Sequence, residues 1–132
     1  MHYLLDTNTC IAMMRNEPAT IARLAIVAPM DCAVSTITAY ELFTGVAKCS
    51  NPSRENAKVE KLLKTVHIIP FDTTAANEAG KIRADLESRG STIGLYDILL
   101  AGHAIAGGLV LVTANTGEFS RVAGLGLENW RK

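Results

Sequence analysis

Residues 2–8, HYLLDTN, decide the fold of this chain. The apolar run at 3–5 ends at the carboxylate Asp6, and small polar residues follow before the chain becomes apolar again. A short apolar run closed by turn residues is typical of a buried strand in a parallel sheet. In open α/β sheets, ligands bind at the carboxyl ends of the strands. The stretch therefore predicts that Asp6 lies at a sheet edge where a site can form.

Three more apolar runs predict strands, at residues 31–35, 66–69 and 109–112, of which the first and the last are expected to be buried, and the tail through Leu127 and Trp130 can add an edge strand. Helices are expected between them, over 9–15, 18–28, 38–47, 54–65, 72–89 and 95–107. Strands that alternate with helices favour a parallel sheet. The predicted fold class is α/β: one domain over residues 1–132, with a short, mostly parallel central sheet of four to five strands flanked by helices on both faces.

The composition indicates a folded domain with one core. The 132 residues are 48% hydrophobic and 20% charged, with thirteen basic and thirteen acidic side chains and no formal net charge. This balance disfavours a module that binds through an overall basic charge. It leaves a nucleic-acid enzyme open, because acids gathered in a site leave basic residues in excess elsewhere.

The cysteines and the hydropathy pattern predict a cytoplasmic protein. Cys10, Cys32 and Cys49 form no C-x-x-C pair and suit a reducing compartment better than a disulfide framework or a zinc site. No apolar stretch approaches the length needed to span a membrane, and we expect no signal peptide and no membrane partner.

Four acids stand at positions where chemistry is expected: Asp6, Glu41, Asp97 and Glu118. Each has an ordinary interpretation as a helix cap or as a first-turn acid. Glu41 would end a capping box that begins at Thr38, and Asn115 to Glu118 has the same spacing. Considered singly, the capping interpretation is at least as good as a functional one.

Considered together, the acids favour a metal site. Three of the four follow a predicted strand, so the fold delivers them to one sheet edge. Two carboxylates 4 Å apart repel by about 4 kcal/mol at an effective dielectric near 20, so a cluster must take up protons or bind a cation. Oxygen ligands favour Mg²⁺ or Mn²⁺, which suit phosphoryl chemistry. Asp72 also follows a strand, but the cap of the next helix explains it fully, and we leave it out of the site.

Several motifs, in order and at their usual spacing, carry a resemblance to a known family. They are LLDTN at 4–8, the segment from Ser35 through Glu41 to Gly45, IRA at 82–84 leading into GLYD at 94–97, AGHA at 101–104, LVTANT at 111–116 and EF at 118–119. Together they resemble a PIN domain, and specifically the VapC toxins of type II toxin–antitoxin modules. The resemblance covers nearly the whole chain.

The resemblance implies a metal-dependent ribonuclease in which a metal-activated water attacks the phosphodiester. Asp6 and Asp97 would bind Mg²⁺ directly, with Mn²⁺ as a substitute, and Glu41 would bind it directly or through water. Glu118 matches a fourth, more variable acid. Asn115 stands where many members have an aspartate, so which of the two completes the site is left open. Hydrogen bonds that orient the carboxylates are expected from Thr7, Asn8, Thr113 and Asn115.

The resemblance also implies partners: an RNA substrate such as tRNA or another structured RNA, a VapB-type antitoxin whose C-terminal segment obstructs the acids, and a second copy in a homodimer. Arg83 and Arg89 flank the helix that leads to Asp97 and are candidates for holding RNA phosphates. Two alternatives remain open. One is a phosphatase with Asp6 as nucleophile, in which Asn8 replaces the second acid of that motif; the other is a non-catalytic binding module whose acids are only caps.

Overall fold

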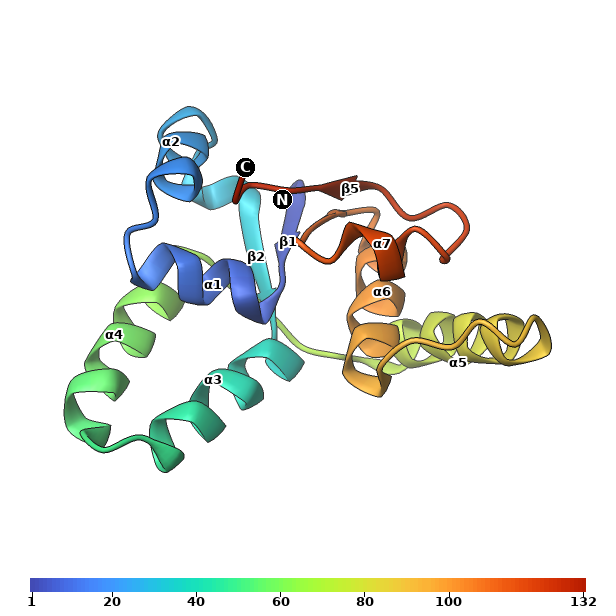
Figure 1. The fold of residues 1–132 in the computed structure, drawn as a ribbon, viewed down its shortest axis with the longest axis horizontal. Helices are drawn as coiled ribbons and strands as arrows, with labels where there is room; N and C mark the ends of the chain where they lie inside the picture. The colour runs from blue at the N-terminus through green and yellow to red at the C-terminus, as the bar shows by residue number, and fades with distance from the viewer.

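The computed structural model describes residues 1–132, and strands alternate with helices along the chain (Figure 1). The strands are β1 (Tyr3–Leu5), β2 (Cys32–Ser35), β3 (His67–Ile69), β4 (Val110–Val112) and β5 (Leu127–Glu128). The helices are α1 (Thr7–Met14), α2 (Pro18–Ile26), the 3-10 turn η1 (Pro29–Asp31), α3 (Thr36–Lys48), α4 (Pro52–Thr65), α5 (Thr73–Ser88), α6 (Leu95–Gly107) and α7 (Thr116–Phe119). None of these helices combines the length and the apolar character needed to cross a bilayer.

The five strands form one sheet in the order β3-β2-β1-β4-β5, and every neighbouring pair is parallel. Strand β1 is central, with Leu4 in register with Ala33 on one side and Leu111 on the other. All five carboxyl ends therefore lie at the same edge. The predicted α/β class and parallel sheet are confirmed, as is the edge strand in the tail.

The core has one part on each face of the sheet. Leu4 and Leu111 belong to a cluster that includes residues of α5 and α6, whereas Leu5 and Val112 belong to a second cluster with residues of α1 and α4. In Figure 1, α5 and α6 lie on one side of the strands and α1, α3 and α4 on the other. Burial on both faces explains why β1, β2 and β4 are almost continuously apolar, whereas β3 at the edge of the sheet is largely exposed.

Helices α5 and α6 approach each other closely at one glycine. A Cβ added at Gly102 would lie 2.5 Å from the backbone nitrogen of Ala79, a distance that real Cβ atoms do not reach. The glycine therefore lets α6, which carries Asp97, pack directly on the backbone of α5.

The start of α3 differs from the prediction. Ser35 is the N-cap, and its Oγ accepts a hydrogen bond from the amide of Ile37 at 3.1 Å. The helix begins at Thr36, so the capping box predicted from Thr38 to Glu41 is wrong. The reason is that β2 runs directly into the helix, which makes Ser35 the first side-chain oxygen available to the free amides. The cap predicted at Asp72 is confirmed by its bond from the amide of Ala75 at 3.0 Å.

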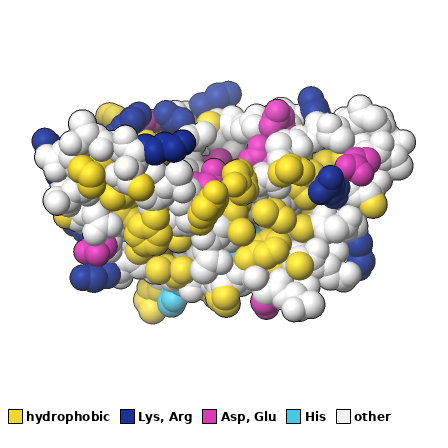
Figure 2. Space-filling view, turned by 90° about the horizontal axis from the view of Figure 1, so that it is seen from below, with side chains coloured by type: hydrophobic (Ala, Val, Ile, Leu, Met, Phe, Trp, Pro, Cys, Tyr) yellow, Lys and Arg dark blue, Asp and Glu magenta, His cyan; other side chains and the backbone are white.

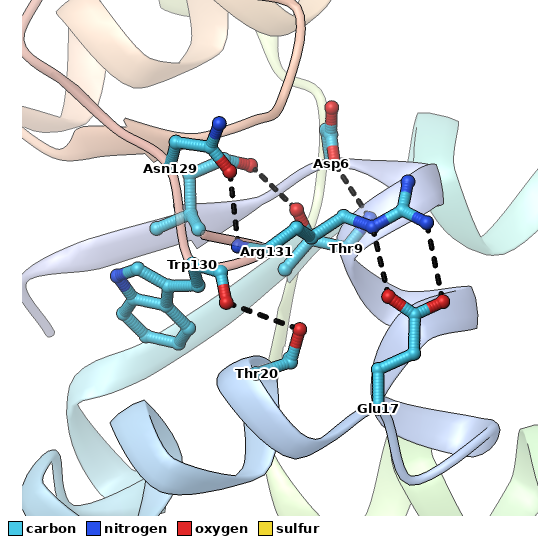
Figure 3. A network of polar contacts seen from close by, with 8 residues as sticks. Asp6, Thr9, Glu17, Thr20, Asn129, Trp130 and Arg131 are labelled. Carbon is cyan, nitrogen blue, oxygen red and sulfur yellow. Dashed lines mark hydrogen bonds and ion pairs between the residues drawn. The ribbon is translucent and has the colours of Figure 1, made fainter.

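The C-terminal tail fastens α2 to the sheet. The carbonyl of Trp130, whose side chain is fully buried, accepts a hydrogen bond from the Thr20 hydroxyl at 3.2 Å. Arg131 forms an ion pair with Glu17 at 3.1 Å (Figure 3). These contacts join the last residues of the chain to α2, whose first residue is Pro18.

Candidate active site

Asp6 stands at the carboxyl end of the central strand. Its amide continues the sheet by donating to the carbonyl of Val112 at 3.1 Å, and its Oδ1 accepts a hydrogen bond from the amide of Thr9 at 2.8 Å (Figure 3). The hydroxyl of Thr9 donates to the same carbonyl of Val112. Asp6 is therefore the N-cap of α1, which begins at Thr7 and not at residue 9 as predicted. Only 7% of Asp6 is exposed, so this carboxylate is held rigidly.

Glu41 comes from α3 and is tied to the start of α1. The hydroxyl of Thr7 donates to Oε1 of Glu41 at 2.7 Å, across 34 residues of sequence. Thr7 follows Asp6 directly, so this bond brings the second acid toward the first. A purely capping role does not account for Glu41, because Ser35 caps its helix.

Asp97 lies in the first turn of α6, near enough to the other three acids for their charges to affect its pKa. The pKa of Asp97 is raised to about 6, first by burial and then by the charges of Glu118, Asp6 and Glu41, with a further contribution from hydrogen bonding to Glu118. Each of these neighbours favours the protonated carboxyl. The fold therefore brings all four predicted acids within electrostatic range of one another, although they come from β1, α3, α6 and α7.

The segment after β4 supplies Glu118 together with a residue that orients it. Asn115 Nδ2 donates to Glu118 Oε2 at 2.8 Å, and the amide of Asn115 donates to the buried hydroxyl of Thr113 at 3.0 Å. Asn115 makes no side-chain cap for α7. The charge near Asp97 thus comes from Glu118, with Asn115 beside it. Asn8 is exposed and makes no side-chain hydrogen bond to any of the four acids.

Other predicted residues lie in different surroundings. Arg83 on α5 and Arg89 at the C-cap of that helix are exposed, and each forms an ion pair with an acid one turn away, Glu87 and Asp85 respectively. Their role toward RNA phosphates stays a prediction. Buried His103 is bonded to Ser35 and to none of the acids.

A tyrosine pair beside the acids was not predicted. The hydroxyls of Tyr40 and Tyr96 lie 3.1 Å apart, and both side chains are exposed. The pKa of Tyr96 is raised mainly by its hydrogen bond with Tyr40, and the charge of Glu41 contributes, so the pair borders the site. The sequence does hold a signal for it, because each tyrosine directly precedes one of the acids. Figure 2 shows acidic side chains near the middle of the face that is seen from below, with hydrophobic side chains next to them.

The residues present fit a hard divalent cation. The donors are carboxylate oxygens with an amide and hydroxyls beside them, the set that Mg²⁺ and Mn²⁺ prefer. As the side chains lie, no three acids are spaced to hold an ion. Binding would therefore require side-chain rotation, which the long Glu41 and Glu118 side chains can make.

The fold and the pocket define an α/β domain with acids gathered at the carboxyl edge of a parallel sheet. The model of the PIN domain family matches residues 3–125. The chain belongs to the PIN-domain family, within the group of VapC proteins, as its sequence motifs predicted.

Relatives match the chain over almost its whole length. It is 37% identical to the tRNA(fMet)-specific endonuclease VapC of Shigella flexneri over 130 residues, which are 98% of each chain. Among solved structures it resembles a DNA-bound VapBC from Salmonella typhimurium, with a TM-score of 0.93, 39% identity and 98% of each chain covered. It also resembles VapBC2 from Rickettsia felis bound to a promoter DNA fragment, with a TM-score of 0.92, 35% identity, and 98% and 99% of the two chains covered.

Proposed function

We propose that this chain is a metal-dependent endoribonuclease, which hydrolyses phosphodiester bonds in RNA as the toxin of a type II toxin–antitoxin module. The observation that carries the proposal is the gathering of four acids at the carboxyl edge of the parallel sheet, where Asp6, Glu41 and Glu118 are near enough to Asp97 to raise its pKa. The ribonuclease names of full-length relatives support it.

The four acids have different proposed roles, which follow from their surroundings. Asp6 and Asp97 would hold Mg²⁺ or Mn²⁺, and Glu41, oriented by Thr7, would bind directly or through water. Glu118, oriented by Asn115, completes the acidic wall. When bound, the ion lowers the pKa of a water molecule and stabilises the oxygens of an in-line displacement. Because the pKa of Asp97 is about 6, most of this carboxyl is ionised at neutral pH and would be available to a cation.

The proposed substrate class is structured RNA, with tRNA as the first to test. The Shigella flexneri relative is named for the tRNA that it cleaves. The chain has no net positive charge, so phosphate contacts must be local. Arg83 and Arg89 are exposed and can exchange their ion pairs on α5 for phosphates.

A groove beside the acids fits the antitoxin. It runs between α1, α3 and α4, with Glu41 in its wall, and it is lined by the apolar side chains of Ile11, Met14, Leu42, Val46 and Val59 together with Arg15 and Lys58. An amphipathic segment of a VapB-type antitoxin lying in this groove would reach Glu41. The solved VapBC complexes of relatives support such a partner.

A homodimer is proposed from the apolar side chains that α3 and α6 expose. Tyr40, Phe43, Leu95 and Tyr96 are each exposed by 46–62%, which is unusual for large apolar side chains gathered on adjacent helices. A second copy of the chain would cover them. Light scattering of the purified protein measures the oligomeric state, and a monomer at micromolar concentration would exclude this part of the proposal.

The test of the proposed activity uses two aspartates with the same local role. Asp6 and Asp72 each follow a strand and cap the next helix, but only Asp6 lies among the acids. Antitoxin-free protein should cleave tRNA with Mg²⁺ and stop when EDTA is added. Asp6→Asn should abolish cleavage, and Asp72→Asn, which keeps an oxygen for its cap, should retain it. Cleavage by Asp6→Asn at the parent rate would refute the proposal.

A further inference from the structure

A buried histidine joins the helices that carry two of the acids. His103 on α6 and Ser35 at the start of α3 are 5% and 0% exposed, and His103 Nδ1 lies 2.9 Å from Ser35 Oγ. Ser35 Oγ at the same time caps α3 by accepting from the amide of Ile37. The two helices therefore share one hydrogen-bonded point, at the N-terminus of α3.

The other bond that Ser35 makes favours one direction for this bond. Ser35 Oγ already accepts a hydrogen bond from the amide of Ile37, and its own hydrogen is free to point at Nδ1 of His103. A neutral imidazole with its proton on Nε2 accepts that hydrogen at Nδ1, whereas a charged imidazolium cannot. The bond exists in this form only while His103 is uncharged.

The loop after β3 holds the pair from a third direction. The ring of Phe71 packs edge-on against His103, with centroids 5.4 Å apart at 88°. The amide of Phe71 donates to the hydroxyl of Thr36, the first residue of α3, at 3.1 Å. The beginning of α3 is thus enclosed by β2, the loop after β3, and α6.

A second link between α3 and α6 shows how the acids are placed. The tyrosine pair joins Tyr40 to Tyr96 on the exposed side, with the hydroxyls 3.1 Å apart. Moving from the histidine link to the tyrosine link goes forward along α3 and backward along α6. Glu41 follows Tyr40 and Asp97 follows Tyr96. Both acids therefore lie next to the tyrosine link, about two helical turns, or roughly 9 Å, from the histidine link.

We infer that His103 is a positioning residue of the nuclease site: by accepting the hydrogen bond of Ser35 it sets the spacing of α3 and α6, and with it the spacing of Glu41 and Asp97. The inference rests on the proposed function and adds a residue to it that touches neither metal nor RNA. Burial lowers the pKa of His103, against the opposing charge of Asp72, and this favours the neutral, accepting imidazole at neutral pH.

Two conservative variants keep or remove the bond to Ser35. In His103→Asn the amide oxygen takes the place of Nδ1 and can still accept from Ser35. In His103→Gln the amide takes the place of Nε2 and no longer reaches Ser35. Calorimetric titration with Mn²⁺ should give parent-like affinity for His103→Asn and an affinity about 10-fold weaker for His103→Gln, the loss typical of residues that orient metal ligands. The Mg²⁺ concentration for half-maximal RNA cleavage should rise by the same factor.

Thr20→Val is the control for a general loss of stability. It removes another buried hydrogen bond, from Thr20 to the carbonyl of Trp130, in the tail and α2. It should lower the melting temperature without changing Mn²⁺ affinity. If His103→Gln and His103→Asn bind Mn²⁺ equally well, or if Thr20→Val weakens binding as much as His103→Gln, the inference is overturned.

A metal-free measurement keeps this inference separate from the proposed function. The backbone amide resonances of Glu41 and Asp97 should shift in His103→Gln and stay near the parent positions in His103→Asn. If the parent neither binds Mn²⁺ nor cleaves RNA, the proposed function fails, and the resonances still decide whether His103 positions the two acids. Unshifted resonances in His103→Gln would refute the positioning role.

Discussion

Asp97→Asn should stabilise the metal-free protein at neutral pH while removing a ligand for the metal. The carboxyl of Asp97 is penalised in the folded state, because burial and the charges of Glu118, Asp6 and Glu41 raise its pKa from 3.8 to about 6. An amide of the same shape carries no charge and escapes that penalty. Stability and activity should therefore change in opposite directions at this residue.

The magnitude follows from the pKa. Raising the pKa by about two corresponds to a cost of about 3 kcal/mol for the ionised carboxyl in the folded state. Solvent screening at this half-buried side chain reduces that cost to about half. Loss of the favourable interaction between the carboxylate and the first turn of α6 subtracts about 0.5 kcal/mol. A net gain of about 1 kcal/mol remains, which corresponds to a rise of about 4 °C in melting temperature for a chain of this length.

The stability difference between Asp97→Asn and the parent should depend on pH. The folded-state pKa of Asp97 is raised, so the stability associated with its protonated form is fully present below pH 3.8 and is lost as the pH rises through 6. The difference between Asp97→Asn and the parent should therefore be largest above pH 7, shrink on acidification and vanish below 3.8. Thermal melts in EDTA from pH 4 to 8 measure it. If Asp97→Asn melts at a lower temperature than the parent at pH 7.5, or if the difference in melting temperature does not change with pH, the acids do not destabilise one another as described.

Two further predictions concern packing and thiol chemistry. Gly102→Ala places a Cβ 2.5 Å from a backbone nitrogen of α5 and should lower the free energy of unfolding, measured in urea, by about 1–3 kcal/mol. In the control Gly80→Ala the new Cβ meets nothing within 4 Å, so the free energy of unfolding should stay the same or rise by up to about 1 kcal/mol. Equal effects of the two substitutions would contradict the close approach of α5 and α6. Burial raises the pKa of the Cys10 thiol and raises that of Cys32 to about 11, so neither thiol should react with iodoacetamide at pH 8 in the native protein. Half-buried Cys49 should react, and mass spectrometry can identify the labelled cysteine. Labelling of Cys10 ahead of Cys49 would contradict the burial of Cys10 in the core.

The sequence predicted the sheet because its strands carry a strong and local signal. Apolar runs buried on both faces, each ended by polar residues, mark β1, β2 and β4 without ambiguity. Parallel strands put their carboxyl ends at one edge, so the meeting of Asp6, Glu41 and Glu118 followed from the order of elements. Asp97 follows no strand, and it was placed in the site by the family resemblance.

What the sequence could not predict depends on where elements end and on which distant side chains meet. Ser35 and Thr38 are both good caps, and only the end of β2 decides between them. The link from His103 to Ser35 spans 68 residues and that from Tyr40 to Tyr96 spans 56. Such pairs leave no periodic pattern, because they depend on how α3 and α6 pack.

If carboxylates from distant parts of the chain share one divalent ion, crystals soaked in Mn²⁺ should reveal that ion in an anomalous difference map. We expect a strong peak within about 2.5 Å of carboxylate oxygens of both Asp6 and Asp97, with Glu41 nearby, and no such peak in Asp6→Asn crystals. A well-diffracting soaked crystal with no peak among these acids, or with its only peak elsewhere on the molecule, would mean that the acids do not share an ion.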